Sequence, residues 1–261
     1  HAQRPDATAC AELELWNQKM SRWVNRGAKG IALLDDTGPR TKLRYVFDIV
    51  DTHLVRGGRT PLLWNLDSHE HEQTILDHLA DTYGLSQTDS MNTALMELAQ
   101  QLTADNLDEA MDGLAYEVAD TFLEELDEDN IRVRFRELMT NSIFYTLSRR
   151  CGQEPMDVLD DDDFIRIVDF NKLPVLSFLG NAVSEQCEAV LFDIGREMRK
   201  IYKKEITQQL EKSVDSLYNT NTDFNALKRE TKEKTTKGGQ ENGVDVSSQG
   251  RLPVPESGRE G

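Results

Sequence analysis

The 261-residue sequence lacks several features that would point to common classes of protein. It has only three cysteines, Cys10, Cys151 and Cys187, and no C-x-x-C spacing, which argues against a zinc ribbon and a disulfide framework. No run approaches the roughly 18 to 20 apolar residues that a membrane-spanning helix needs, and no secretory signal opens the chain. We therefore predict a cytoplasmic protein without membrane contact, whose cysteines are small buried apolar residues.

Motifs of catalytic and metal chemistry are missing as well. The sequence has no P-loop, no G-x-G-x-x-G after a strand and no nucleophile elbow. His69, His71 and His78 lack the H-E-x-x-H spacing of a metallopeptidase, because Ile75 stands where the second histidine would be. The aspartates at 160–163 lack the glycine and spacing of a calcium loop, so we expect a solvated loop that caps the next segment. We predict no active site, no cofactor and no metal in this chain.

Acidic residues outnumber basic ones by 47 to 30, and the acidity is concentrated in the middle of the chain. The net charge is -17. Residues 1–60 carry 10 Lys/Arg against 7 Asp/Glu, residues 61–200 carry 10 against 30, and residues 201–261 carry 10 against 10. Such asymmetry suggests that the mildly basic opening section and the acidic middle contact different partners.

The opening section predicts a helix followed by a β-hairpin. Apolar residues recur at helical spacing before Gly27, a natural residue for the end of a helix: Cys10, Leu13, Trp16, Met20 and Trp23. Residues 30–35 and 42–52 then have the alternation and composition of two strands joined by a turn.

The remainder of the chain is predicted to be mainly helical. Apolar stripes at helical spacing occupy residues 75–83, 91–102, 107–122 and 135–147, with Asn106 as a candidate cap before the third. A long stripe over 176–201 indicates a bundle helix that projects outward, or a short coiled coil. The predicted fold class is α+β, comprising a small helix plus β-hairpin unit (1–60), a mainly α-helical acidic bundle (61–212) and a disordered C-terminal tail (213–261).

Basic, aromatic and glycine residues are grouped in the opening section and form a candidate nucleic-acid-binding site. Its predicted members are Arg22, Trp23, Arg26, Gly27, Lys29, Gly30, Arg40, Lys42 and Arg44. Single-stranded nucleic acid is bound by positive grooves with aromatic faces on which bases stack, and backbone N–H groups of a glycine turn add phosphate contacts. The same residues also fit a simpler interpretation, in which the aromatics are core and the cations form a solvated rim.

The segments HAQRPDATACAELELWNQKMSRWVNRGAKGIALLDD (1–36) and KLRYVFDIVDT (42–52) resemble the opening region of very large proteins of conjugative and integrative elements. More distantly, they are similar to the N-terminal domain of ArdC-type antirestriction proteins. The shared core of that domain is an aromatic residue followed by V-x-x-G-x-K-G-I, matched here by Trp23, Val24, Gly27, Lys29, Gly30 and Ile31. The segments RCGQEP and FNKLPVLSFLGNAVSEQ resemble the next region of the same large proteins.

The resemblance implies a non-catalytic DNA-binding segment of a larger DNA-processing protein, with single-stranded DNA as the favoured ligand. Helicase and methylase modules downstream in the same polypeptide would be its other partners. The metallopeptidase half of the ArdC type is missing, and a helix that usually precedes the first segment is expected before His1. Two alternatives stay open, namely a protein-interaction segment without DNA contact, and a DNA mimic whose acidic helices occupy a restriction enzyme's DNA site.

Overall fold

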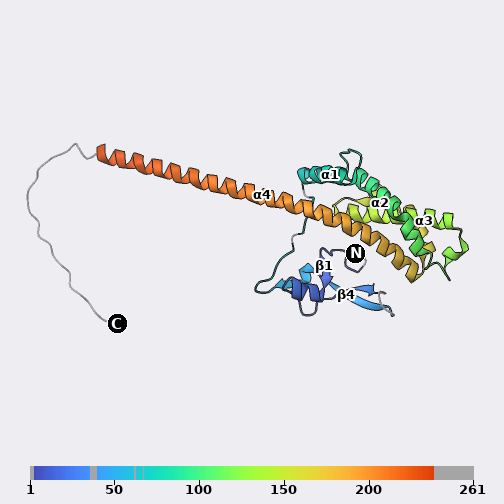
Figure 1. Cartoon of the computed structure of the whole chain (residues 1–261). Coiled ribbons are helices and arrows are strands. Elements are labelled where there is room, and N and C mark those ends of the chain that lie inside the picture. The colour runs from blue at the N-terminus through green and yellow to red at the C-terminus, as the bar shows by residue number, and fades with distance from the viewer. Residues whose placement is uncertain (1–2, 36–39, 62, 67, 238–261) are drawn as a thin grey trace, which may run out of the picture. The chain divides into compact units, whose positions relative to one another are not determined.

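The structure is a computed structural model that describes residues 3–35, 40–61, 63–66 and 68–237. The chain divides into two compact units after Tyr202. The first unit contains a sheet region, defined here as residues 3–61, and a helical bundle, defined as residues 69–202 (Figure 1). A small sheet region followed by a mainly helical part confirms the predicted α+β fold class.

Five short strands form two antiparallel sheets in the sheet region. The three-stranded sheet has the order β1-β4-β3 and consists of β1 (Cys10–Glu12), β4 (Lys42–Asp48) and β3 (Ile31–Asp35). The two-stranded sheet consists of β2 (Arg22–Val24) and β5 (Thr52–Leu54). Antiparallel pairing of β3 with β4 confirms the predicted hairpin. Its predicted turn, at 36–39, lies outside the described residues.

The helix predicted to run from Cys10 to Trp23 is wrong. Only a single π-helical turn, η1 (Leu15–Lys19), lies between strands β1 and β2. This segment forms strands because it pairs with segments far ahead in the sequence. Cys10 pairs with Asp48 of β4, and Trp23 pairs with His53 of β5. Backbone hydrogen bonds to these partners replace those that a helix would make within itself.

The sheet region has very little apolar interior. Among its described residues, Trp16 is the one buried apolar side chain, and its Nε1 donates to the Phe47 carbonyl at 2.7 Å. The other buried side chains are polar, namely Arg22, Asp48 and Thr52. Cys10, predicted to be buried, is exposed in β1, whereas Cys151 and Cys187 of the bundle are buried as predicted. Hydrogen bonds between buried polar groups therefore supply a large share of the stability of this region.

Asp48, at the end of β4, is the centre of this polar network. Its carboxylate accepts hydrogen bonds from the N–H groups of Thr8 (2.5 Å), Ala9 (3.2 Å) and Val50 (2.9 Å), and from the Thr8 hydroxyl. Burial alone would raise the pKa of Asp48, but the hydrogen bonds from Val50 and Thr8 favour the ionised form and hold its pKa below its ordinary value. The charged carboxylate thus joins the N-terminal segment to β4 and to η2 (Ile49–Asp51).

Four helices pack around one apolar core in the bundle, and their bounds are α1 (His69–Tyr83), α2 (Met91–Leu114), α3 (Glu128–Arg150) and α4 (Leu173–Lys237). Between α2 and α3 lies the 3-10 helix η3 (Phe122–Glu125), and between α3 and α4 lie η4 (Pro155–Asp157) and η5 (Asp161–Phe170). Side chains at the N-caps start three of the helices, because Ser68, Ser90 and Asp127 accept hydrogen bonds from the N–H three residues ahead. Asp160 caps η5 in the same way, which agrees with the predicted cap, but residues 161–163 form the first turn of η5 and not the predicted loop.

Three predicted helix boundaries in this part of the chain are wrong, and the first is the end of the stripe over 107–122, since α2 already ends at Leu114. The break expected at Asn106 lies inside α2, where the Asn106 amide donates to the Leu102 carbonyl and to Gln186 of α4 instead of capping a helix. The tail predicted from residue 213 is helical as far as Lys237, because residues 203–237 are rich in Lys, Glu and Gln, which favour helices without needing a core. The remainder of the predicted tail, 238–261, lies outside the described residues.

None of the helices in the described part of the chain has the length and apolar character needed to cross a membrane.

Trp64, in the segment that leads into the bundle, packs against Arg150 and Gly195. The Arg150 guanidinium lies 3.6 Å from the centroid of its ring and donates to its carbonyl at 3.0 Å, and burial lowers the pKa of Arg150. Gly195 of α4 also lies against the indole, because a Cβ added there would be 2.9 Å from Trp64 Nε1. The glycine therefore makes room for the indole.

We expect Asp48→Ala to lower the free energy of unfolding of the sheet region by about 2–3 kcal/mol, because the Thr8 and Val50 N–H groups lose a charged acceptor. In the wild type this contribution is complete above the ordinary aspartate pKa of 3.8, and it is lost as the pH falls through the lower pKa of the folded state. Hydrogen exchange of the β4 amides measures the effect. Equal protection in variant and wild type at pH 7 would contradict it.

Two glycines of α4 provide a matched pair of tests. Nothing lies within 4 Å of a Cβ added at Gly180, so Gly180→Ala should raise stability by about 0.5–1 kcal/mol through helix propensity. Gly195→Ala gains the same propensity but displaces Trp64, so we expect it to be about 1–2 kcal/mol less stable than Gly180→Ala. Urea unfolding followed by circular dichroism measures both. Equal stability of the two variants would show that Trp64 does not depend on the glycine.

Candidate nucleic-acid interface

An exposed aromatic pair lies on the β2–β5 ribbon, which we define as strands β2 and β5 with loops 25–30 and 55–59. The strands are antiparallel, and Trp23 stands directly opposite His53. Directly opposed residues share one face of a sheet, with Cβ atoms about 4.5–5.5 Å apart. Trp23 is 56% exposed and His53 is also exposed. The ribbon therefore presents an indole and an imidazole side by side to solvent.

Arg22, predicted to contact nucleic acid, lies instead in the interior. It is 8% exposed, its Nε donates to Thr52 Oγ1 at 2.7 Å, and its guanidinium also reaches Thr60 Oγ1 at 3.3 Å. Thr52 Oγ1 in turn donates to the Ile49 carbonyl at 2.7 Å. The prediction for Arg22 is wrong because side chains alternate along β2, so that Trp23 points outward and Arg22 points inward. On the inner face Arg22 connects β2 to β5 through its hydrogen bond with Thr52.

The first loop, 25–30, places two predicted cations next to one end of the ribbon. The Asn25 N–H donates to the Asp51 carbonyl at 2.8 Å, and His53 Nδ1 donates to Asn25 Oδ1 at 2.7 Å. Gly27 then turns the chain at a φ of 88°, which a side chain would strain. Arg26 and Lys29, on either side of the turn, are exposed.

The second loop, 55–59, lies at the opposite end of the ribbon because the strands are antiparallel. Its backbone is attached to the start of β2, since the Val55 N–H donates to the Ser21 carbonyl at 3.2 Å and the Arg59 N–H donates to the Met20 carbonyl at 2.8 Å. Arg56 and Arg59 are exposed. Sequence reasoning missed both arginines and His53. Two arginines around Gly57-Gly58 were a visible signal, but the pairing that brings them to β2 was not.

The loop cations Arg26, Lys29, Arg56 and Arg59 have no ion-pair partner among the residues that the structure describes. The described carboxylates of the sheet region are all engaged elsewhere: Asp6 and Asp51 with Arg4, Glu12 with Arg44, Glu14 with Gln18, Asp35 with Lys42, and Asp48 with N–H groups. The positive charge of this region is therefore available to a ligand mainly at the two ends of the ribbon.

The other predicted site residues lie in or beside the three-stranded sheet. Lys42 Nζ is 3.2 Å from Asp35 Oδ2, and an Arg44 guanidinium nitrogen is 3.2 Å from Glu12 Oε1, so both cations already have acidic partners. Arg40 is exposed just before β4. Gly30 has a packing role, because a Cβ there would lie 3.1 Å from Tyr45 Cβ. The structure thus keeps Trp23, Arg26, Gly27 and Lys29 together and does not add Lys42 or Arg44 to the ribbon.

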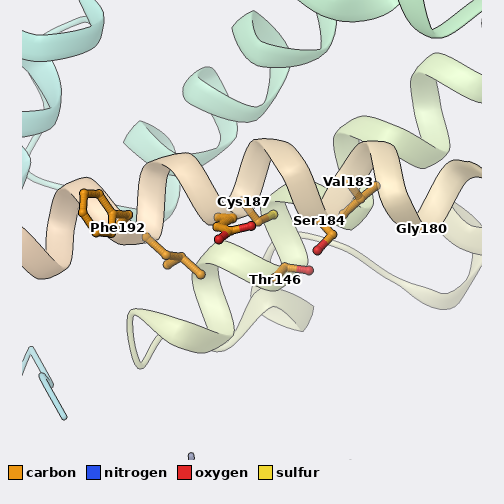
Figure 2. Close-up of a pocket in the computed structure, with 8 residues that line it drawn as sticks. Thr146, Gly180, Val183, Ser184, Cys187 and Phe192 are labelled. Carbon is orange, nitrogen blue, oxygen red and sulfur yellow. The ribbon is translucent and has the colours of Figure 1, made fainter. Parts of the chain in front are cut away.

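A shallow groove of about 690 Å³ lies on the bundle, and Figure 2 shows its lining along α4 with Thr146 of α3 beside it. Burial raises the pKa of the Cys187 thiol in this groove to about 11, so the sulfur is protonated at neutral pH and is a poor nucleophile. Burial likewise raises the pKa of Cys151 to about 12. Among the described residues, no group of three or more His, Cys, Asp or Glu side chains has the arrangement of a metal site.

No protein-family model, no curated protein and no solved structure matches this chain. The resemblance to mobile-element and ArdC-type proteins therefore rests on the residues of segments 1–36 and 42–52 and stays an expectation.

Substitution of a buried arginine of the ribbon should lower the free energy of unfolding more than substitution of an exposed one. We expect Arg22→Ala to lower the free energy of unfolding by about 2 kcal/mol, because the buried Thr52 hydroxyl and carbonyl lose a charged donor. Arg26→Ala, at an exposed position with no ion-pair partner among the described residues, should change it by less than about 0.5 kcal/mol. Urea unfolding followed by tryptophan fluorescence compares the two. Equal effects would contradict the division of the ribbon into an inner and an outer face.

Proposed function

We propose that the β2–β5 ribbon binds single-stranded nucleic acid, DNA in the first place, and that this chain is a non-catalytic accessory segment of a larger DNA-processing protein of a mobile element. The strongest support for this proposal comes from the arrangement of aromatic and basic side chains on the ribbon. The exposed Trp23–His53 pair lies between two loops that carry four cations without intramolecular partners among the described residues. Aromatic faces flanked by positive charge are what a single strand requires.

The exposed indole favours a single strand over a duplex. In a duplex the faces of the bases are covered by their neighbours, whereas a single strand can place a base on the Trp23 ring. Such a stack contributes about 1–3 kcal/mol and tolerates any base. Arg26 and Lys29 at one end of the ribbon, with Arg56 and Arg59 at the other, suit phosphates on either side of the stacked base.

The charge of the bundle restricts where nucleic acid can bind. Residues 61–200 carry 30 Asp/Glu against 10 Lys/Arg, so the field of this part repels phosphate. The ribbon lies outside this acidic part and carries four exposed cations, so binding should depend on them. We place this activity in the cytoplasm, because all three cysteines are free thiols, and we expect the downstream domains of the parent protein to be the other partners.

Paired charge-removal variants test the proposal. We expect Arg26→Ala/Lys29→Ala to reduce the slope of log K against log [salt] by about 1.4, since each phosphate contact to a single strand contributes about 0.7. Lys42→Ala/Arg44→Ala removes the same charge from the three-stranded sheet, where both cations are already ion-paired, and should leave the slope nearly unchanged. Fluorescence anisotropy of a labelled single-stranded oligonucleotide, from low to physiological salt, measures both variants.

The same titration distinguishes the alternatives. Equal slopes for the two double variants would reject the ribbon as the contact surface. Absence of binding at low salt, by a chain shown to be folded by circular dichroism, would reject the proposal altogether and favour a protein-interaction or DNA-mimic role for the acidic bundle.

Trp23→Ala tests the stacking part of the proposal separately from charge. Affinity for the single strand should fall about 5- to 150-fold, which corresponds to about 1–3 kcal/mol, while the salt slope stays the same because no cation is lost. Trp23→Phe should restore part of the affinity. An unchanged affinity in Trp23→Ala would show that the aromatic pair is not a stacking platform.

A further inference from the structure

The distal helix, which we define as residues 203–237 of α4, presents apolar side chains to solvent. Ile206 is 58% exposed, Leu210 is 61% exposed and Val214 is 47% exposed. Their spacing of four residues places them along one face of the helix. No described residue covers this face. Three large apolar side chains in a row on one face of a helix are characteristic of a helix that packs against another.

The sequence continues this apolar face along the helix. Leu210, Leu217 and Phe224 repeat every seven residues, and Ile206 and Leu227 occupy the second seam position of the same heptads. From Ile206 to Leu227 the seam spans about 32 Å at 1.5 Å per residue. A seven-residue repeat of this length is the pattern by which helices pair in coiled coils, and isolated helices gain most of their stability from such packing.

The charge of the distal helix is compatible with packing against the distal helix of a second copy of this chain. Residues 203–237 carry eight Lys/Arg and six Asp/Glu, so two copies can approach without strong repulsion, in contrast to the acidic bundle. A nucleic acid would gain little from this nearly neutral surface. A membrane surface also fits poorly, because the distal helix carries six Asp/Glu beside its eight Lys/Arg and so lacks a predominantly basic polar face.

We propose that the distal helix is a self-association site, at which the seam around Ile206 and Leu210 packs against the same seam of a second copy of this chain. Lys203, Ser213 and Thr220 interrupt the apolar seam positions, so the association is of micromolar strength rather than permanent. This site does not include the β2–β5 ribbon. A dimer formed through it would contain two ribbons. The proposal does not depend on nucleic-acid binding.

Sedimentation equilibrium of the full chain, free of nucleic acid, tests the proposal from about 1 to about 200 µM, the range in which a micromolar dimer forms. The wild type should pass from monomer to dimer. Leu210→Lys places a charge in the seam and should weaken association at least tenfold. The control Gln208→Lys adds the same charge at an exposed position on the opposite side of the heptad and should associate like the wild type.

Circular dichroism at the lowest concentration shows whether each variant keeps its helices, so that a loss of dimer is not a loss of fold. A wild type that stays monomeric over the whole range overturns the proposal. A dimer that persists in Leu210→Lys, or one that Gln208→Lys disrupts equally, overturns the assignment of the seam.

Discussion

The buried carboxylate of Asp48 is the constraint on which the sheet region depends. Its described residues include a single buried apolar side chain, Trp16, so the hydrophobic effect contributes little and the fold depends on polar groups that find partners. Asp48 binds N–H groups on both sides of β4, at Thr8 and Val50, and an unpaired charge in that position would be costly. The pKa of Asp48 stays below its ordinary value because the fold favours its ionised form.

The same constraint positions the candidate interface. η2 begins at the Asp48 cap and leads directly into β5, and β5 is the strand that places His53 beside Trp23. Arg22 then fixes β2 to β5 from the inner face, which leaves the outer face free for the aromatic pair. The described carboxylates of this region have partners elsewhere, so none of them pairs with the exposed loop cations. The contacts of Asp48 and Arg22 thus position the strands of the ribbon, and the pairing of the described carboxylates leaves its exposed loop cations available to a ligand.

Local patterns predicted the bundle well and the sheet region only in part. Helical stripes and side-chain caps depend on neighbours three or four residues away, so Ser68 and Asp160 could be assigned from the sequence. The hairpin of β3 and β4 was predictable for the same reason. Cys10 to Trp23 has helical spacing, yet its residues pair with β4 and β5, some thirty residues or more ahead, and no local pattern carries that information. The outward Trp23 and the inward Arg22 are consequences of this pairing, and so is the role of His53.

The three tryptophans of this chain provide the most direct test of the account. Trp16 is buried on the Phe47 carbonyl, Trp64 is buried against Arg150, and Trp23 alone is exposed on the ribbon. Their indole N–H signals can be followed by NMR in the full-length chain while an unlabelled single-stranded oligonucleotide is added at low salt. We expect the Trp23 signal to shift and saturate, while the signals of Trp16 and Trp64 keep their positions. Binding that leaves Trp23 unchanged, or that shifts only Trp64, would contradict it.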